Sequence, residues 1–507
     1  MKVTLIYPDF EYRKSINGFY VEHGGWYHEG IAQLGAVAEE EKVDLDLIHL
    51  TGPIGKEEFI EDLKKRNPDV VGFSALRTGN LLFTKDAVQW AKEALPKAII
   101  ILGGYLPTLE PEKSIAIENV DAIFLGEGEI SFAYFLRKVK EGKSFKDTPS
   151  TWVKDGDQIV KNKMAPVIEN LDDLPLPKFD LFDFEKLIVA PLGIGLALVT
   201  RGCPYNCTYC WNNRARKLYP NQNKYVRFRS PRNAVDYLKK LLEHYPKLRK
   251  IRFEDDIWPV YKEWGEELKE LYLKEIGLPF DCNYRANLFT EQLAKLLKEM
   301  GCEYVYFGVE SGNEHIRNNV LKRMMSEEDI IKAFDLAKKY KLKTCAYNIM
   351  GSPYENMRTA LDTIKLNAKI NPDVMFFPIY YPYGGSDLHQ MSIDAGFYDP
   401  NKPLDPLVNV VMPDFSRNQI LFAFSYAKLF VRLYQLSSKF PGFLGKLGEK
   451  VLDRIWLCKI LPHFVLYKLM SIYRLFINAS KRFIRKRLTP LYFVLKKSKI
   501  LEKLGNM

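Results

Sequence analysis

Short apolar runs alternate with amphipathic stretches over the first 130 residues of the chain. Five runs are apolar throughout or alternate with a period of two, which predicts strands at residues 3–7, 43–50, 70–75, 98–102 and 122–125. Three stretches between them repeat apolar positions at helical spacing and predict helices at residues 28–41, 59–65 and 83–95. Because strand and helix alternate, and glycines follow strands at Gly103 and Gly126, we expect a doubly wound parallel sheet in residues 1–150, with a ligand crevice at the carboxyl ends of its strands.

A second alternation begins near Leu196. Six apolar runs predict strands at residues 196–200, 250–254, 280–285, 304–309, 344–349 and 374–379, and helical periodicity lies between them, for example at 231–245, 289–300 and 326–340. Six such units predict a partial (β/α)6 barrel over residues 191–395, whose chemistry belongs at the carboxyl ends of the strands. Residues 151–190 show little periodicity and carry Pro166, Pro175 and Pro177, so we expect a linker with short strands.

Residues 396–507 are rich in Leu, Phe, Ile, Tyr, Lys and Arg, and Gly442, Gly445 and Pro462 divide them into several predicted helices. Apolar residues recur at roughly helical spacing with basic residues among them: Leu421, Phe424, Leu429, Phe430, Leu433 and Leu436, with Lys428, Arg432 and Lys439. The longest uncharged runs, such as 418–427, have about ten residues, whereas a bilayer requires ~20. We therefore expect a basic, amphipathic helical region that does not cross a membrane.

The positive charge of the chain is concentrated in this region. Residues 417–507 hold 19 lysines and arginines against three acidic residues, while the formal charge of the whole chain is +11. Basic clusters at 481–487 and 496–499 lie among apolar residues. Excess positive charge points to phosphates of nucleic acid or of an anionic membrane, and the apolar faces favour the membrane. A helical cap on the barrel with a solvated face is the plainer interpretation.

The composition narrows the class of protein. Hydrophobic residues make up 47% of the chain and charged residues 27%, as in ordinary globular proteins, which excludes disorder. Seven cysteines in 507 residues exclude a disulfide scaffold and suit a reducing compartment. The first nine residues lack the apolar stretch of a secretory signal, so we expect a cytoplasmic protein peripheral to the membrane.

Three of the cysteines, Cys203, Cys207 and Cys210, stand close together after the first strand of the second alternation. Three thiolates on one loop can hold a 4Fe–4S cluster and leave one iron open for a substrate or cofactor. A structural zinc site takes four ligands, but the next cysteine is Cys282 and the next histidine is His244. The spacing therefore favours an iron–sulfur cluster with an open corner.

This cysteine spacing, followed by a barrel, resembles the radical S-adenosylmethionine (SAM) superfamily. The resemblance covers roughly residues 196–388 and implies that the open iron binds SAM, that an electron from the cluster cleaves it to a 5′-deoxyadenosyl radical, and that the radical abstracts hydrogen from an unactivated carbon. It also implies SAM-binding roles for residues at the strand ends: Tyr209, Glu254, Asp255, Arg285, Glu310 and Ser311. A reductant such as ferredoxin or flavodoxin is the implied partner.

The N-terminal part resembles the cobalamin-binding domain fused to one large class of these enzymes. The resemblance implies a cobalamin site at three stretches that follow strands: Ser74, Leu76 and Thr78; Gly103, Gly104 and Thr108; and Gly126, Glu127 and Gly128. The Asp-x-His-x-x-Gly loop that supplies an axial histidine in other cobalamin proteins is absent after the first strand. His23 and His28 are therefore expected to be structural or to face the substrate, and a domain that keeps the fold without the cofactor is the alternative.

These features together predict a radical SAM enzyme that acts on a lipid or isoprenoid at the membrane surface, with methylation, cyclisation or carbon–carbon coupling as the outcome. One alternative is a cobalamin-dependent methyltransferase of a soluble natural product or tetrapyrrole precursor. Another, from a different class, is an iron–sulfur electron-transfer protein. No RNA-binding module is recognisable, so a nucleic-acid substrate is not favoured.

Overall fold

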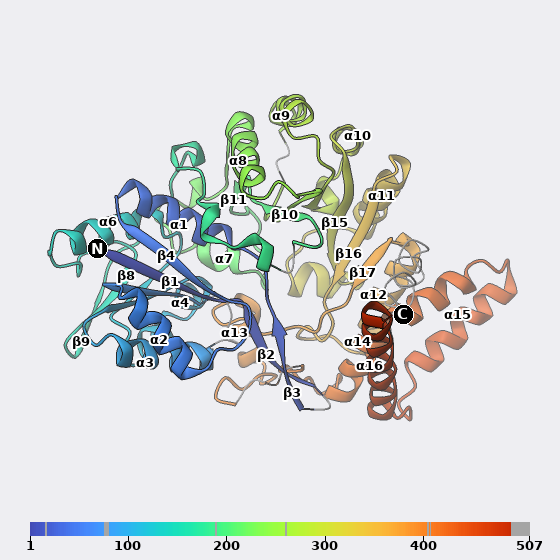
Figure 1. Cartoon of the computed structure of the whole chain (residues 1–507). Coiled ribbons are helices and arrows are strands. Elements are labelled where there is room, and N and C mark those ends of the chain that lie inside the picture. The colour runs from blue at the N-terminus through green and yellow to red at the C-terminus, as the bar shows by residue number, and fades with distance from the viewer. Residues whose placement is uncertain are drawn as a thin grey trace.

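A computed structural model gives the architecture of the chain. It describes residues 1–15, 18–75, 81–187, 190–258, 261–402, 405 and 407–487. Figure 1 shows two α/β units side by side, with three C-terminal helices beyond the second.

The first unit is a seven-stranded sheet with the order β4-β1-β5-β6-β7-β8-β9. Its strands are β1 (Lys2–Pro8), β4 (Asp44–Leu50), β5 (Val70–Ser74), β6 (Ile99–Gly103), β7 (Ala122–Phe124), β8 (Thr151–Asp155) and β9 (Gln158–Lys161). The first five run parallel, and β8 and β9 add an antiparallel hairpin. The predicted doubly wound sheet is confirmed, and its strand order reverses between β1 and β5, where ligands of such sheets bind.

Helices cover both faces of this sheet. They are α1 (Glu29–Glu40), α2 (Lys56–Arg66), α3 (Leu81–Ala94), α4 (Tyr105–Leu109), α5 (Pro111–Ile115) and α6 (Glu129–Lys140). Between β1 and α1 the chain forms a hairpin of β2 (Phe10–Ser15) and β3 (Gly18–His23), which the hydrophobic pattern did not predict. The base of this hairpin is closed by Asp9, whose carboxylate accepts hydrogen bonds from the N–H groups of Gly25 and Trp26 at 2.6 and 2.9 Å.

The second unit is a six-stranded parallel sheet in sequence order, the partial barrel that the sequence predicts. Its strands are β10 (Ile194–Ala197), β13 (Lys250–Phe253), β14 (Phe280–Tyr284), β15 (Cys302–Glu310), β16 (Lys343–Asn348) and β17 (Val374–Phe376). Its outer helices are α8 (Pro231–His244), α9 (Lys262–Glu275), α10 (Glu291–Glu299), α11 (Glu327–Lys339) and α12 (Met357–Ile370). A short ribbon of β11 (Thr200–Arg201) and β12 (Arg227–Phe228) and the helices α7 (Trp211–Arg216) and α13 (Asp387–Asp394) complete the unit.

Residues 179–184, between the two sheets, pack against both units. Their aromatic side chains contact Tyr27, just before α1, on one side and α8 on the other: Phe179, Phe182 and Phe184 lie 5.0–6.1 Å from Tyr27 between ring centroids, and Phe179 and Phe184 contact Tyr237 and Tyr245. One continuous hydrophobic core therefore spans both units, which fixes the carboxyl ends of one sheet relative to those of the other.

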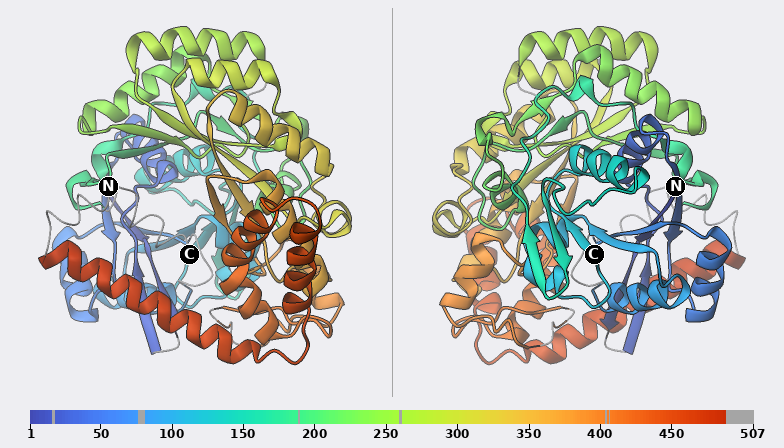
Figure 2. Two further views of the ribbon diagram at one scale, coloured as in Figure 1. Left: turned by 90° about the vertical axis from the view of Figure 1, so that its right-hand side faces the viewer. Right: turned by 90° about the vertical axis from the view of Figure 1, so that its left-hand side faces the viewer.

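The C-terminal region forms α14 (Arg417–Ser437), α15 (Phe443–Trp456) and α16 (His463–Arg487), with breaks at the predicted Gly442 and Pro462. The predicted break at Gly445 is wrong, because this residue lies inside α15. Leu421, Phe422 and Phe430 of α14 are buried in a core that α12 shares, so α14 is part of the barrel unit. The face predicted from periodicity is wrong in part, because Leu436 is 53% exposed. No helix in the described part of the chain is long and apolar enough to span a bilayer. Figure 2 shows the three helices from two sides.

Candidate functional site

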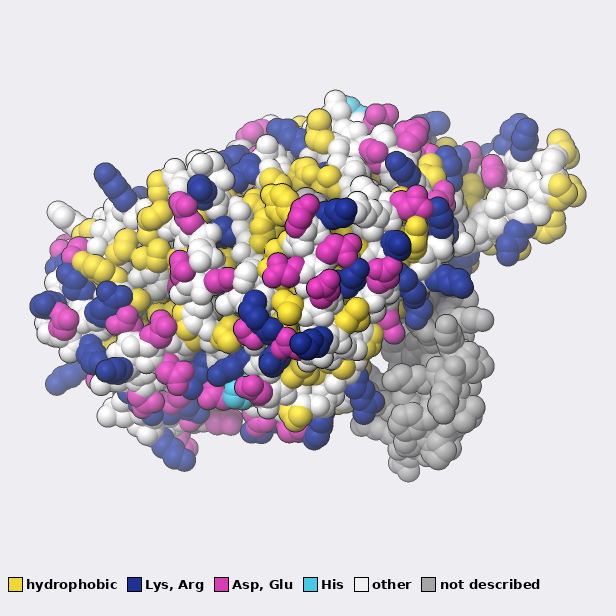
Figure 3. Space-filling model, turned by 90° about the horizontal axis from the view of Figure 1, so that it is seen from above, with side chains coloured by type: hydrophobic (Ala, Val, Ile, Leu, Met, Phe, Trp, Pro, Cys, Tyr) yellow, Lys and Arg dark blue, Asp and Glu magenta, His cyan; other side chains and the backbone are white. Residues whose placement is uncertain are grey.

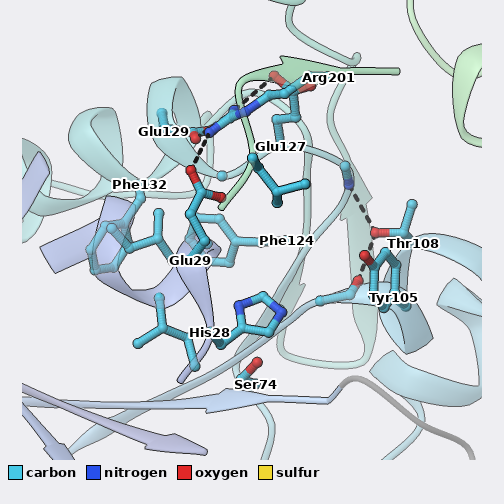
Figure 4. A pocket seen from close by; sticks show the side chains of 18 of the residues that line it. His28, Glu29, Ser74, Tyr105, Thr108, Phe124, Glu127, Glu129, Phe132 and Arg201 are labelled. Atoms are coloured by element: carbon cyan, nitrogen blue, oxygen red, sulfur yellow. Dashed lines mark hydrogen bonds and ion pairs between the residues drawn. The ribbon is translucent and has the colours of Figure 1, made fainter. Parts of the chain in front are cut away.

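A cavity of about 520 Å³ lies where the carboxyl ends of the two sheets face each other. Its lining comes from both units: Ser74, Gly103, Gly126 and Glu127 from the first sheet, and Thr200, Arg201, Gly202 and Asp256 from the second. Figure 4 shows His28 and Glu29, at the start of α1, and Arg201 of β11 pointing into the cavity. The site is therefore shared between the units.

One end of the cavity is an apolar slot inside the first unit. It runs between the sheet and helices α1 and α6 and is lined by Leu5, Leu34, Ile101, Phe124 and Phe132. Gly72 keeps the slot open, since a Cβ atom there would stand 2.7 Å from the Leu5 side chain and 3.3 Å from Ile101. A slot of this kind accepts a flat or elongated apolar group next to a sheet.

The glycine loops at the mouth of the slot are tied together by Thr108. Its hydroxyl donates to the Gly104 carbonyl at 2.7 Å and accepts from the Gly126 N–H at 2.9 Å. Gly104 has φ +106°, and a Cβ there would meet the Ala75 carbonyl oxygen at 2.9 Å, so only glycine fits. Two loops that were predicted separately for cobalamin are therefore joined. We refer to Gly103, Gly104, Thr108 and Gly126 as the cradle. Of the predicted residues, Leu76 and Thr78 lie outside the described residues.

A buried ion cluster joins the cradle to the second unit. Arg201 pairs with Glu129 at 2.7 Å, with Glu127 at 3.4 Å and with Glu29 at 4.0 Å. Arg227, on the neighbouring strand β12, makes a two-pronged contact with the Glu127 carboxylate. Burial alone would raise the pKa of Glu127, but the two guanidiniums hold that pKa below its usual value. We refer to Arg201, Arg227, Glu29, Glu127 and Glu129 as the interdomain clamp.

The three predicted cysteines lie on the loop that follows the clamp strand β11 and leads into α7. All three are free thiols; Cys207 is buried, and Cys203 and Cys210 are partly exposed. Burial raises the pKa of Cys210 to about 12 and that of Cys203 above its usual value, so binding a metal here releases protons. Among the described residues no group of three or more His, Cys, Asp or Glu side chains is arranged to hold a single metal ion. A four-iron cluster carries each protein thiolate on a different iron and so suits more widely spaced thiols.

Two arginines face the buried thiol. Arg285, which follows β14, and Arg323 donate to Cys207 Sγ at 3.7 and 3.6 Å. Cationic donors stabilise a thiolate and the negative charge of a cluster bound through it. The donor set of the loop therefore fits a thiolate-bound iron–sulfur cluster.

The predicted SAM-binding residues do not form one group. Tyr209 donates to Glu310 Oε1 at 2.9 Å, and burial raises the pKa of Glu310, whose nearest cation is Arg323 at 4.0 Å. Ser311 is fully buried and accepts from the N–H of Asn313. Glu254 lines the interdomain cavity and pairs with Arg252 at 2.9 Å.

Asp255 stands apart from these groups. It is buried under β11, and its Oδ1 accepts from the N–H groups of Val199 and Thr200 and from the Thr200 hydroxyl at 2.6–2.9 Å. Burial raises the pKa of Asp255 to about 7. Its neighbour Asp256, which the Gly202 N–H and Asn212 contact, lines the cavity.

Sequence reasoning did not select Asp256, Arg201, Glu29 or Tyr105, although all four line the cavity. Tyr105 of α4 packs edge-on against Trp211 of α7, with ring centroids 4.7 Å apart, and so connects the cradle to the cysteine loop. Two features of the sequence could have pointed to these residues. Asp256 is the third acid of the Glu254-Asp255-Asp256 run, and Arg201 stands two positions before Cys203.

Residues 198–366 match the model of the Radical SAM superfamily, and residues 23–136 match that of the B12 binding domain. An uncharacterised methyltransferase from Pyrococcus horikoshii is 28% identical over 368 residues, which are 72% of this chain and 78% of the relative. The anaerobic magnesium-protoporphyrin IX monomethyl ester cyclase of Rubrivivax gelatinosus is 25% identical over 405 residues, covering 77% of this chain and 70% of the relative.

Among solved structures, the radical S-adenosylmethionine methyltransferase TsrM from Kitasatospora setae, with cobalamin and a 4Fe–4S cluster bound, has a TM-score of 0.66 at 14% identity. The match covers 89% of this chain and 98% of that one. At this identity the likeness concerns the fold alone.

Proposed function

Because this chain belongs to the radical SAM enzymes that carry a cobalamin-binding domain, we propose that it transfers a methyl group through cobalamin to an unactivated carbon of its substrate. The chain is an enzyme, and its cofactors are a 4Fe–4S cluster, SAM and cobalamin. The observation that carries the proposal is the cavity that both domains line, with the glycine cradle on one side and Gly202 and Trp211, which flank the cysteine loop, on the other. Methyl transfer requires those two sites to share one substrate position.

We assign the cluster to Cys203, Cys207 and Cys210, and cobalamin to the cradle and slot. When bound, the three groups supply an electron, a hydrogen-abstracting radical and a methyl group. The chain itself positions and shields them. Arg285 and Arg323 neutralise charge at Cys207, Asp256 offers an acceptor to the cationic amine of SAM, and the apolar slot excludes water. Tyr209, Glu254, Glu310 and Ser311 remain candidates for SAM, whereas Asp255 is proposed to act by supporting the loop.

For the substrate we propose a soluble molecule, a natural product or a tetrapyrrole precursor, in place of the lipid expected from the basic region. The relative from Rubrivivax gelatinosus is named for a tetrapyrrole ester, which supports this choice.

A membrane lipid is the second candidate, and one observation favours it. Helix α15 exposes Leu447, Val451 and Ile455 at helical spacing, each 43–45% exposed, with Lys446, Lys450 and Arg454 next to them. Figure 3 shows this helix as the arm at the right, carrying hydrophobic and basic side chains. An apolar row flanked by cations is the pattern of a helix that lies on an anionic membrane surface.

The test is anaerobic reconstitution with iron, sulfide and hydroxocobalamin. We expect about four irons per chain, a cobalamin absorption band, and 5′-deoxyadenosine when SAM and a reductant are added. Cys207→Ala should lose the cluster and all 5′-deoxyadenosine formation, because the open-corner cluster needs all three thiolates. Cys458→Ala, a partly exposed cysteine outside the loop, is the matched control and should retain both. A wild-type chain that binds cluster and SAM but no cobalamin would contradict methyl transfer.

A further inference from the structure

We infer that an open groove beside the cysteine loop is the docking site of an acidic protein that donates single electrons to the cluster. The groove has a volume of about 510 Å³ and lies apart from the interdomain cavity, with which it shares no lining residue. Pro204, Tyr205 and Asn206 of the cysteine loop form one wall, and Asn319, Lys322 and Met324, which follow β15, belong to the other. The inference rests on the proposed cluster, because the electron has no acceptor without it.

The groove lies one side chain away from the groups that contact the buried thiol. Tyr205, between Cys203 and Cys207, lines the groove and stacks on the Arg285 guanidinium, 3.5 Å from the ring centroid. Arg285 in turn donates to Cys207 Sγ at 3.7 Å. A redox group held in this groove would therefore be separated from a cluster thiolate by two packed side chains, which is a short distance for electron transfer.

The second wall is built to present Lys322 and Met324 outward. Both adopt left-handed backbone conformations, with φ +50° and +52°, while Arg323 between them turns inward to Cys207 Sγ and to the Gly308 carbonyl. Non-glycine residues in this region of φ are strained and persist only where the surroundings hold them. The contacts of Arg323 thus fix the exposed pair at the groove, and Met324 is 68% exposed.

Of the described residues that line the groove, Lys322 is the one with a charged side chain, and its positive charge favours an acidic partner. Lys322 is exposed and, in the described part of the chain, pairs with no carboxylate. Arg216 contacts the same wall, donating to the Pro204 carbonyl at 2.6 Å and to the Asn206 side-chain oxygen, and among the described residues it pairs with no carboxylate. Residues 488–507 of this chain, with four lysines and one glutamate, would be repelled by these cations. A reduced flavin or iron–sulfur protein with an acidic face fits the groove.

Docking transfers one electron. The donor is oxidised by one electron, the cluster is reduced by one, and no covalent bond or proton moves. Electrostatic steering makes such encounters fast at low salt, and replacing one charge at the contact changes the association rate more than the final affinity.

The experiment uses the full chain with its cluster reconstituted anaerobically, and follows bleaching of the visible cluster absorbance after rapid mixing. One donor is fully reduced flavodoxin, an acidic protein; the other is reduced methyl viologen, a small cation that needs no docking surface. For Lys322→Glu we expect the ratio of the flavodoxin rate to the viologen rate to fall about tenfold at low salt and the difference to shrink at high salt. Met324→Glu should lower the ratio in the same direction.

Lys274→Glu is the matched control, since Lys274 is an exposed lysine of the outer helix α9 and should leave the ratio unchanged. A ratio unaffected by Lys322→Glu and Met324→Glu overturns the docking site while leaving the proposed function intact. Equal slowing by both donors also overturns it, because the loss would then lie in the cluster. A wild-type chain that assembles no cluster overturns the proposed function as well.

Discussion

The interdomain clamp and helix α15 place charge and apolar surface in opposite ways. In the clamp, two guanidiniums and three carboxylates are largely withdrawn from water and satisfy one another, with Arg201 only 15% exposed. On α15, leucine, valine and isoleucine side chains face outward, with Lys446, Lys450 and Arg454 next to them. Paired buried charges fix geometry because each ion specifies its partner, whereas exposed apolar surface has affinity for any apolar neighbour.

The clamp therefore positions the two units relative to each other, whereas α15 presents a surface to which another molecule can attach. The clamp strand β11 leads directly into the cysteine loop, and Glu127 follows Gly126 of the cradle, so the clamp holds the two proposed cofactor sites at a fixed separation. Helix α15 contacts the rest of the molecule chiefly through α14, with Trp456 buried against Phe422 and Phe430. Changes in α15 should therefore leave the cofactor sites alone.

The largest effect is expected from breaking the clamp with Arg201→Met. Removing one partner leaves buried carboxylates uncompensated, and the free energy of unfolding should fall by about 3–5 kcal/mol in urea titrations. The affinity for hydroxocobalamin, measured by absorbance, should fall too because Glu127 loses a partner. Adding Glu129→Gln should recover part of the stability.

Arg232→Met is the control for that change. Arg232 of α8 also pairs with two acids, Asp236 and Glu275, but it is 43% exposed, and its loss should cost less than about 1 kcal/mol. Equal losses in the two variants would show that the clamp is an ordinary surface ion pair.

A second effect tests the polar side of the cavity through pH. Burial lowers the pKa of His28 to about 4, against the opposing charge of Asp9 and with a smaller lowering by His49. As pH falls, the unfolded chain binds a proton at this histidine before the folded chain does, which favours unfolding. The stability contributed by His28 is therefore full above the unfolded pKa of about 6.5. It is lost as pH falls from there to about 4, by about 3 kcal/mol for this group. Its ring packs edge-on to Tyr7 at 5.6 Å, so phenylalanine fits the site.

His28→Phe should remove that part of the pH dependence. The measurement is the difference between wild-type and variant unfolding free energies at pH 7 and pH 4, which isolates His28 from other groups that titrate in the same range. A difference that does not change with pH would mean that His28 is solvated when folded.

The sequence predicted the two sheets well, because their strands are buried on both faces and stand out as continuous apolar runs. It did not predict the β2–β3 hairpin, although Asn17-Gly18 is a strong hairpin turn signal between segments that mix aromatic and charged residues. The insertion separates His28, which was expected to be structural or to face the substrate, from the first strand in sequence, yet His28 lines the cavity. His28 returns to the carboxyl end of β1 only after the hairpin.

The cysteine loop was predictable because its three ligands lie within eight residues. The clamp was not, since Arg201 is 172 positions from Glu29, and nothing in a charged side chain's own neighbourhood names its distant partner. For the same reason the sequence could not decide between Asp255 and Asp256. Which of two adjacent carboxylates faces the cavity depends on the hydrogen bonds that Val199 and Thr200 give to Asp255.

The smallest effect on stability is expected from α15, and it separates the two candidate substrates. Replacing Leu447, Val451 and Ile455 together by alanine should change the free energy of unfolding by no more than about 0.5 kcal/mol per site, because nearly half of each residue is exposed and none belongs to the hydrophobic core of this region. Phe422→Ala in the core under the same helix should cost about 3–5 kcal/mol.

Flotation with vesicles containing anionic lipid should nevertheless fall at least tenfold in the triple variant, since membrane insertion is driven by the apolar area that the three substitutions remove. Leu273→Ala on α9, an exposed leucine outside the row, should float as the wild type does. If the wild-type chain does not float, or if the triple variant floats equally well, the exposed row has no membrane role. The soluble molecule is then the remaining candidate substrate.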